Sequence, residues 1–202
     1  TPFIPRLSMD PIAALRAVKG DDFYICAFQD YGVAEAQLDA DIGHSLRGFY
    51  RKGGFIDAKR GDASNLREWE NFELLKILQR DESAWPGALL LSDEEFAIYE
   101  AGFARTGFRG AINWYRNFTR NWEKSVDFEQ KISVPSLMIC AENDAALPPA
   151  MADGMDKYVA DLETYLIEDC GHWTQSEKPE VLSGLMVDWL ERRFGEITKD
   201  KA

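Results

Sequence analysis

An aspartate and a histidine near the C-terminal end of this 202-residue chain could act together as a general base. Asp144 ends the segment Ala141-Glu-Asn-Asp144, and His172 follows 28 residues later in Asp169-Cys-Gly-His-Trp173. A carboxylate beside an imidazole fixes the tautomer of the ring and stabilises the ring once it is charged. Spacing alone does not separate this catalytic interpretation from two structural residues, because an Asp in a loop is often a cap and a His beside a Trp is often structural.

Two short apolar segments lead into these residues. Residues 134–140 and 164–167 contain β-branched residues and have the pattern of strands that are buried on both faces of a parallel sheet. Residues 149–159 predict a helix between them, so the order is β-α-β. Loops at the carboxyl ends of strands carry the site in an open α/β sheet. The sequence therefore predicts an α/β fold with Asp144 and His172 in one crevice.

The chain before residue 130 has helical patterns instead. Asp10 and Pro11 mark a first helix start, and Ser92 with Glu95 forms a capping box for a later one. We predict a helical segment at residues 1–129 and an α/β segment at 130–202, which the family resemblance described below interprets as a lid and the C-terminal part of an α/β-hydrolase core. The remaining helices predicted for the lid cover residues 33–50, 65–80 and 111–122, with a glycine- and charge-rich loop at 52–64.

The last predicted helix begins at Pro179 and carries a wide apolar stripe that must pack on a sheet. Two strands do not make a stable parallel sheet, so the sequence predicts that the core has a partner segment.

Composition limits the possible partners and cofactors. Lys plus Arg number 23 and Asp plus Glu 35, so the net charge of −12 makes nucleic acid and anionic membrane surfaces improbable partners. The sequence shows neither a signal peptide nor an apolar run near 18 residues, and we expect a cytoplasmic protein with three buried free cysteines. His44 and His172 lie far apart without metal-ligand spacing, so we expect no metal and no cofactor.

Several motifs in this sequence resemble the soluble epoxide hydrolases of the α/β-hydrolase fold, over about residues 1–194. Phe28-Gln-Asp-Tyr-Gly-Val-Ala-Glu-Ala-Gln-Leu38 resembles part of the lid of that family. The other motifs, in chain order, are Thr106-Gly-Phe-Arg-Gly110, Asn113-Trp-Tyr-Arg-Asn117, Asn121-Trp122, Ala141-Glu-Asn-Asp144 and Glu168-Asp-Cys-Gly-His-Trp-Thr-Gln175, followed by Glu177-Lys-Pro179.

The resemblance implies roles for two lid tyrosines and for the Asp/His pair. Tyr115 and Tyr24 would donate hydrogen bonds to the epoxide oxygen, since a phenol stays protonated at neutral pH. Without the family, Tyr115 is more simply a core aromatic residue. His172, oriented by Asp144, would activate the water that cleaves an alkyl-ester intermediate. A small apolar epoxide would contact Trp173, Trp114, Phe28, Leu147 and Met138.

The nucleophile of this family is missing from the sequence. There is neither a Gly-x-Ser/Asp-x-Gly elbow nor a His-Gly-x-Pro segment in the 202 residues. We therefore expect the N-terminal half of the same hydrolase to act as a companion segment, and a homodimer is possible. Two alternatives stay open: a relative of haloalkane or fluoroacetate dehalogenases, and a non-catalytic binding domain derived from a truncated hydrolase.

Overall fold

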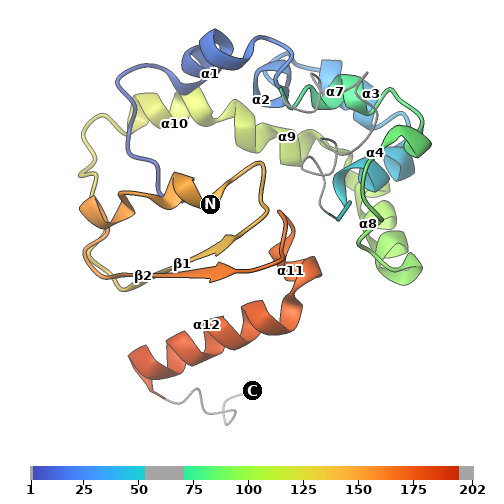
Figure 1. Cartoon of the computed structure of the whole chain (residues 1–202). Coiled ribbons are helices and arrows are strands. Elements are labelled where there is room, and N and C mark those ends of the chain that lie inside the picture. Colours follow the sequence, from blue (N-terminus) through green and yellow to red (C-terminus); the bar gives the residue numbers. More distant parts are fainter. Residues whose placement is uncertain (1, 53–70, 196–202) are drawn as a thin grey trace. The chain divides into compact units, whose positions relative to one another are not determined.

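The computed structural model describes residues 2–52 and 71–195 (Figure 1). The chain forms two compact units. One is a helical unit, Ile4–Gln130, and the other is an α/β unit that combines Thr1–Phe3 with Lys131–Ala202.

The helical unit contains two helices that begin where the sequence predicts. The side chain of Asp10 accepts a hydrogen bond from the backbone N–H of Ala13 at 2.8 Å, which caps a helix that starts at Pro11. Ser92 and Glu95 form the predicted capping box. Among the described residues of this unit, the helices are α1 (Pro11–Lys19), α2 (Tyr24–Ala27), α3 (Val33–Leu38), α4 (Ile42–Phe49), α7 (Leu74–Ile77), the 3-10 turn η3 (Glu82–Ala84), α8 (Asp93–Thr106), α9 (Arg109–Arg116) and α10 (Phe118–Lys124).

Two predicted helices are wrong as single elements. The helix predicted at 33–50 is divided into α3 and α4, because Asp41 caps α4 by accepting a hydrogen bond from the N–H of His44 at 2.8 Å. The helix predicted at 111–122 is divided into α9 and α10 at Asn117. Apolar periodicity continues across both breaks and hides them.

The predicted loop at 52–64 and the first part of the predicted helix at 65–80 lie outside the described residues, apart from Lys52. The described part of that helix contains only the single turn α7, which ends at Ile77.

Two buried clusters form the interior of the helical unit. Leu38, Leu46, Ile77 and Ile112 are each only 1% exposed and belong to the larger cluster. The smaller cluster contains Ile12, Phe23, Ile25 and Cys26, and the half-buried rings of Tyr24 and Tyr115 pack against both clusters. Each large apolar side chain that is buried in this way stabilises the fold by about 1.5–3 kcal/mol.

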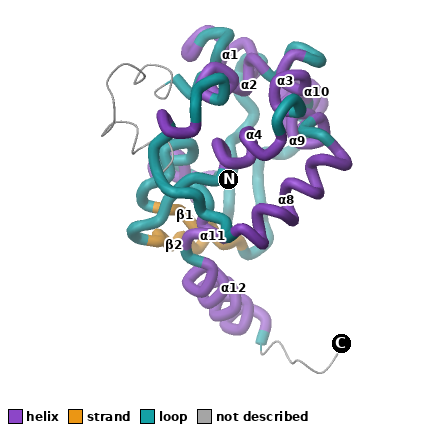
Figure 2. The backbone as a smooth tube through the Cα atoms, turned by 90° about the vertical axis from the view of Figure 1, so that its right-hand side faces the viewer, coloured by secondary structure: helices purple, strands orange, loops and turns teal. Residues whose placement is uncertain are grey.

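The α/β unit contains the predicted parallel strand pair, β1 (Ser136–Ala141) and β2 (Leu162–Ile167) (Figures 1 and 2). Its register aligns Ser136 with Leu162 and Ala141 with Ile167, so both strands end at the same edge. The short α11 (Thr174–Glu177) and the long α12 (Pro179–Phe194) follow. Leu182 and Leu185 of α12 pack against Ala141, Ile167 and Cys170, which covers one face of the strands.

Two expectations for this unit are wrong. Residues 149–159 form no α-helix but two 3-10 turns, η4 (Pro149–Ala152) and η5 (Met155–Lys157), because Gly154 between them has φ +78°. The strands are not buried on both faces: Leu166, on the opposite face from Ile167, is 51% exposed. Part of the apolar stripe of α12, including Val181 and Met186, is also exposed among the described residues.

Cys26, Cys140 and Cys170 are free and buried, as predicted. No helix in the described ranges 2–52 and 71–195 is long and apolar enough to span a membrane.

Candidate active site

The loop that leaves β1 holds Asp144 in a buried position. The side chain accepts hydrogen bonds from the backbone N–H groups of Ala146 and Leu147, each at 2.9 Å to Oδ1. The residue is 8% exposed, and these local bonds satisfy a carboxylate that has little access to water. Leu147, predicted to line the pocket, thus also orients the acid through its backbone.

The loop that leaves β2 carries His172 to this carboxylate. Nδ1 of His172 lies 3.0 Å from both carboxylate oxygens of Asp144. The adjacent ends of β1 and β2 bring the two side chains into hydrogen-bond contact, and their role as a catalytic pair stays a prediction. The His172 side chain is 42% exposed, and Nε2 is the ring nitrogen on the side away from Asp144.

Electrostatics favour the charged form of Asp144. Burial alone would raise its pKa, but the hydrogen bonds from His172 and from the N–H of Leu147 outweigh burial, and the net pKa lies below the ordinary value. The carboxylate is therefore ionised at neutral pH. It holds the proton of a neutral His172 on Nδ1, and Nε2 is then free to accept a proton.

Glu177 holds the histidine loop, residues 168–173, through two backbone hydrogen bonds. Its carboxylate accepts the backbone N–H of Gly171 at 2.9 Å and that of Trp173 at 3.2 Å, which are the two residues flanking His172. A Cβ at position 171 would lie 2.8 Å from Oε1 of Glu177, so a larger residue there would require the Glu177 carboxylate to shift. Sequence reasoning missed this contact, although Thr174-x-x-Glu177 has the spacing of a helix start.

The other predicted pocket residues of this unit are only partly buried. The Trp173 ring meets the His172 ring edge-on, with centroids 5.2 Å apart and planes at 77°. Met138 is half-buried in β1. Their contacts with substrate, like that of the Leu147 side chain, stay predictions.

Tyr24 and Tyr115 lie together within the helical unit. Tyr24 begins α2 and Tyr115 belongs to α9, and their ring centroids are 5.3 Å apart with planes at 82°. Phe28 contacts both, at 5.6 Å from Tyr24 and 5.5 Å from Tyr115. The structure thus brings together three of the residues predicted for the lid. It does not bring Trp114 to them, since this side chain is 79% exposed on α9.

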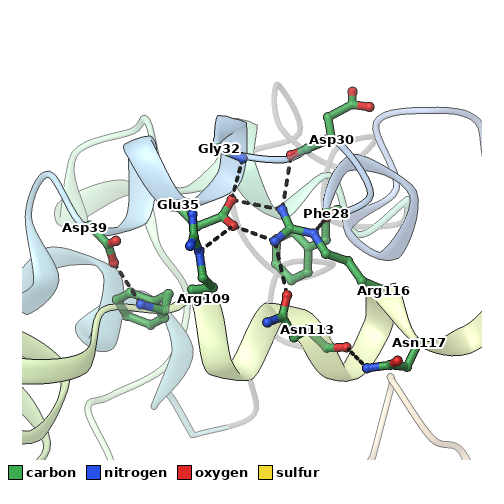
Figure 3. Close-up of polar contacts among 10 residues, drawn as sticks. Phe28, Asp30, Gly32, Glu35, Asp39, Arg109, Asn113, Arg116 and Asn117 are labelled. Atoms are coloured by element: carbon green, nitrogen blue, oxygen red, sulfur yellow. Dashed lines mark hydrogen bonds and ion pairs between the residues drawn. The ribbon is translucent and has the colours of Figure 1, made fainter.

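A buried ion pair joins α9 to α3, and its arginine follows Tyr115 directly in the sequence (Figure 3). Arg116 donates to both carboxylate oxygens of Glu35, at 2.5 Å and 2.9 Å. The two side chains are 4% and 9% exposed. Hydrogen bonding to the Arg116 guanidinium lowers the pKa of Glu35 to about 2, so the carboxylate stays charged in the interior. Both residues lie within motifs of the family resemblance, which gave them no role. They are 81 positions apart, so the sequence did not predict their contact.

These features agree with the comparisons to known proteins. Residues 57–179 match the alpha/beta hydrolase fold family, and this chain belongs to that family. Among its relatives, the chain is 35% identical over 196 residues to bifunctional epoxide hydrolase 2 of Mus musculus and 34% identical over 192 residues to epoxide hydrolase A of Mycobacterium tuberculosis.

Solved structures of epoxide hydrolases also match this chain. Epoxide hydrolase A from Mycobacterium thermoresistibile has a TM-score of 0.76 at 31% identity, covering 94% of this chain and 59% of that one. An epoxide hydrolase from an endophytic Streptomyces has a TM-score of 0.80 at 29% identity, covering 97% of this chain and 60% of that one.

The matched proteins are longer than this chain. The match to the mouse protein includes 95% of this chain but only 33% of the mouse protein. The match to the mycobacterial protein includes 94% of this chain and 58% of that protein.

Proposed function

We propose that this chain is the lid and C-terminal core segment of an epoxide hydrolase, which converts an epoxide to a vicinal diol through a covalent alkyl ester. The observation that carries the proposal is the hydrogen bond from His172 to the buried, ionised Asp144. The names of the relatives favour an epoxide over a haloalkane as the substrate. The intact Asp/His pair also favours an enzyme over a binding domain.

In the first step a carboxylate, supplied by a segment outside these 202 residues, attacks one carbon of the epoxide. The carbon–oxygen bond of the ring breaks, and the electron pair goes to the oxygen. Tyr24 and Tyr115 donate hydrogen bonds to this oxygen, and one of them transfers its proton. The close pairing of the two rings supports this role, because two donors stabilise a developing alkoxide better than one.

In the second step Nε2 of His172 takes a proton from water, and the resulting hydroxide attacks the ester carbonyl. The acyl carbon–oxygen bond breaks, the leaving alkoxide takes the proton of the new carboxyl group, and the diol is released with the carboxylate restored. The proton held by His172 then returns through solvent to the tyrosine that was deprotonated in the first step. Asp144 stabilises the imidazolium that forms in this step. The pKa of Asp144 below its ordinary value supports this assignment, since a charged partner is needed when the ring becomes positive.

The assay that tests this function measures diol formation from styrene oxide by the full-length polypeptide. Turnover that exceeds the uncatalysed rate by several orders of magnitude is expected of an enzyme. The same protein should leave a chlorinated alkane unchanged. Release of chloride without diol formation would instead identify a dehalogenase.

A further inference from the structure

Arg116 has no hydrogen-bond donor left for a ligand. The guanidinium of Arg116 carries five N–H groups, and five acceptor atoms of the helical unit lie within hydrogen-bond distance of its nitrogen atoms. Beside the two oxygens of Glu35, these are the carbonyl oxygens of Phe28 at 2.7 Å and Asp30 at 3.2 Å, and the side chain of Asn113 at 3.3 Å (Figure 3). Arg116 therefore offers no free hydrogen-bond donor to the hollow of about 460 Å³ beside it. Its hydrogen bonds instead hold backbone and side-chain groups of the protein itself.

The backbone that Arg116 holds is the segment that follows Tyr24. Helix α2 ends at Ala27, and the carbonyl groups of Phe28 and Asp30 lie in the turn that follows it, where the oxygen of Asp30 also accepts the N–H of Val33 at 3.4 Å. Arg116 donates to both carbonyl groups from α9, one residue after Tyr115. Glu35 links the same guanidinium group to α3, and its Oε2 also accepts a hydrogen bond from the N–H of Gly32 at 3.0 Å. One side chain thus joins three helices around the tyrosine pair.

Gln29 makes the return contact. Its Nε2 donates to the carbonyl oxygen of Tyr115 at 3.3 Å and to that of Ile25, one residue after Tyr24, at 2.8 Å. The segment that carries Tyr24 and the helix that carries Tyr115 are therefore linked in both directions. Arg116 reaches from α9 to the α2 segment, and Gln29 reaches back from that segment to α9.

We propose that Arg116, together with Glu35 and Gln29, is a positioning residue that fixes Tyr24 relative to Tyr115 so that both phenol groups can donate to a single epoxide oxygen. This inference rests on the proposed function. Misplacement of a reacting group by about 1 Å can slow a reaction about 100-fold, so a rigid link between two donors has a direct effect on the rate.

The test is Arg116→Lys in the full-length protein, with styrene oxide under single-turnover rapid-quench conditions. Lysine keeps the charge opposite Glu35, but its single ammonium cannot span the carboxylate and two carbonyl groups as a planar fork does. The rate constant of ring opening should fall about 10- to 100-fold. The rate constant of ester hydrolysis, which depends on His172, should stay within about twofold of the parent.

Arg120→Lys is the matched control, because Arg120 is exposed on α10 and undergoes the same chemical change. It should leave both rate constants unaltered. Gln29→Met gives a second variant that keeps the ion pair, and it should slow ring opening alone by a smaller factor. Equal loss in both steps would indicate a general structural role and overturn the proposal, and so would parent-like ring opening in both Arg116→Lys and Gln29→Met.

A second measurement separates this inference from the proposed function. In protein with ¹³Cζ-labelled tyrosine, the resonances of Tyr24 and Tyr115 should both shift in Arg116→Lys and not in Arg120→Lys. If the parent opens no epoxide, the proposed function fails while this result still reports on positioning. Unmoved tyrosine resonances in Arg116→Lys would overturn the positioning role, whatever the activity.

Discussion

The histidine loop and the tyrosine pair are held by opposite kinds of charge. In the α/β unit, the carboxylate of Glu177 accepts the N–H groups of Gly171 and Trp173, which flank His172. In the helical unit, the guanidinium of Arg116 donates to carbonyl groups that follow α2. Backbone N–H groups are unpaired before a helix and carbonyl groups after one, so each helix end needs its own kind of partner.

The range of these contacts also differs. Glu177 lies four and six residues from the groups it holds, whereas Arg116 lies 86 and 88 residues from its carbonyl partners. The histidine loop is thus held partly by its own sequence neighbourhood and partly by the loop that follows β1, whereas Arg116 holds the tyrosine pair through the folded helical unit alone. We expect the two chemical steps to be separable by mutation for this reason.

The largest effect should come from His172→Gln. Glutamine cannot accept a proton from water, so steady-state diol formation should fall by about three orders of magnitude or more. Ring opening, assigned to the tyrosines, should continue for one equivalent of styrene oxide. Multiple turnovers at the parent rate would remove His172 from the mechanism and with it the division between the two regions.

Glu35→Gln should have the next largest effect, and on stability. It leaves the buried Arg116 without its charged partner, which costs about 3 kcal/mol of unfolding free energy at neutral pH. The pKa of Glu35 falls on folding from 4.5 to about 2, so its contribution is complete above about pH 5 and is lost as the pH falls toward 2. Urea unfolding across this range should show the parent and the variant converging at low pH.

Glu123→Gln provides the control for this experiment, because Glu123 is exposed on α10. It should leave the unfolding free energy nearly unaltered at every pH. A constant difference between the parent and Glu35→Gln down to pH 2 would contradict the assignment of the acid-sensitive contribution to Glu35.

Tyr115→Phe should slow ring opening by about 10- to 100-fold, less than the loss of a lone oxyanion donor, because Tyr24 remains as a second donor. Phenylalanine keeps the packing of the ring against Phe28 and Tyr24. Single-turnover kinetics with styrene oxide measure the step directly. An unaltered rate would return Tyr115 to the role of a core aromatic residue.

Glu177→Gln should have the smallest effect. The amide keeps one acceptor oxygen and loses the other, which removes about 1 kcal/mol of positioning for the His172 loop. Ester hydrolysis should slow by about 5- to 10-fold, while ring opening stays at the parent rate. Glu180→Gln, at an exposed position in α12, is the control. Slower ring opening in Glu177→Gln would show that the regions are not independent.

The sequence was sufficient where the signals were local. Two buried-strand patterns placed Asp144 and His172 at one edge of a parallel pair, and caps at Asp10 and Ser92 located two helix starts. It failed where a cap interrupts a continuing apolar period, as at Asp41. The predicted helix at 149–159 is absent because Gly154 adopts a positive φ that periodicity does not report.

The Arg116–Glu35 pair was missed for another reason. An 81-residue separation leaves no local pattern, and charged residues are ordinarily expected on the surface. The pairing of Tyr24 with Tyr115 depended on family resemblance in the same way, since nothing in the spacing of two tyrosines 91 positions apart predicts contact.

The most direct test of the account is to find where styrene oxide becomes attached to the full-length His172→Gln protein. Intact mass followed by peptide mapping should show one covalent adduct, an ester on a carboxylate outside these 202 residues. The parent protein treated in the same way should show no lasting adduct. An ester on a carboxylate within this sequence, or no adduct on the variant, would contradict the assignment of ester hydrolysis to His172 and of the nucleophile to another segment.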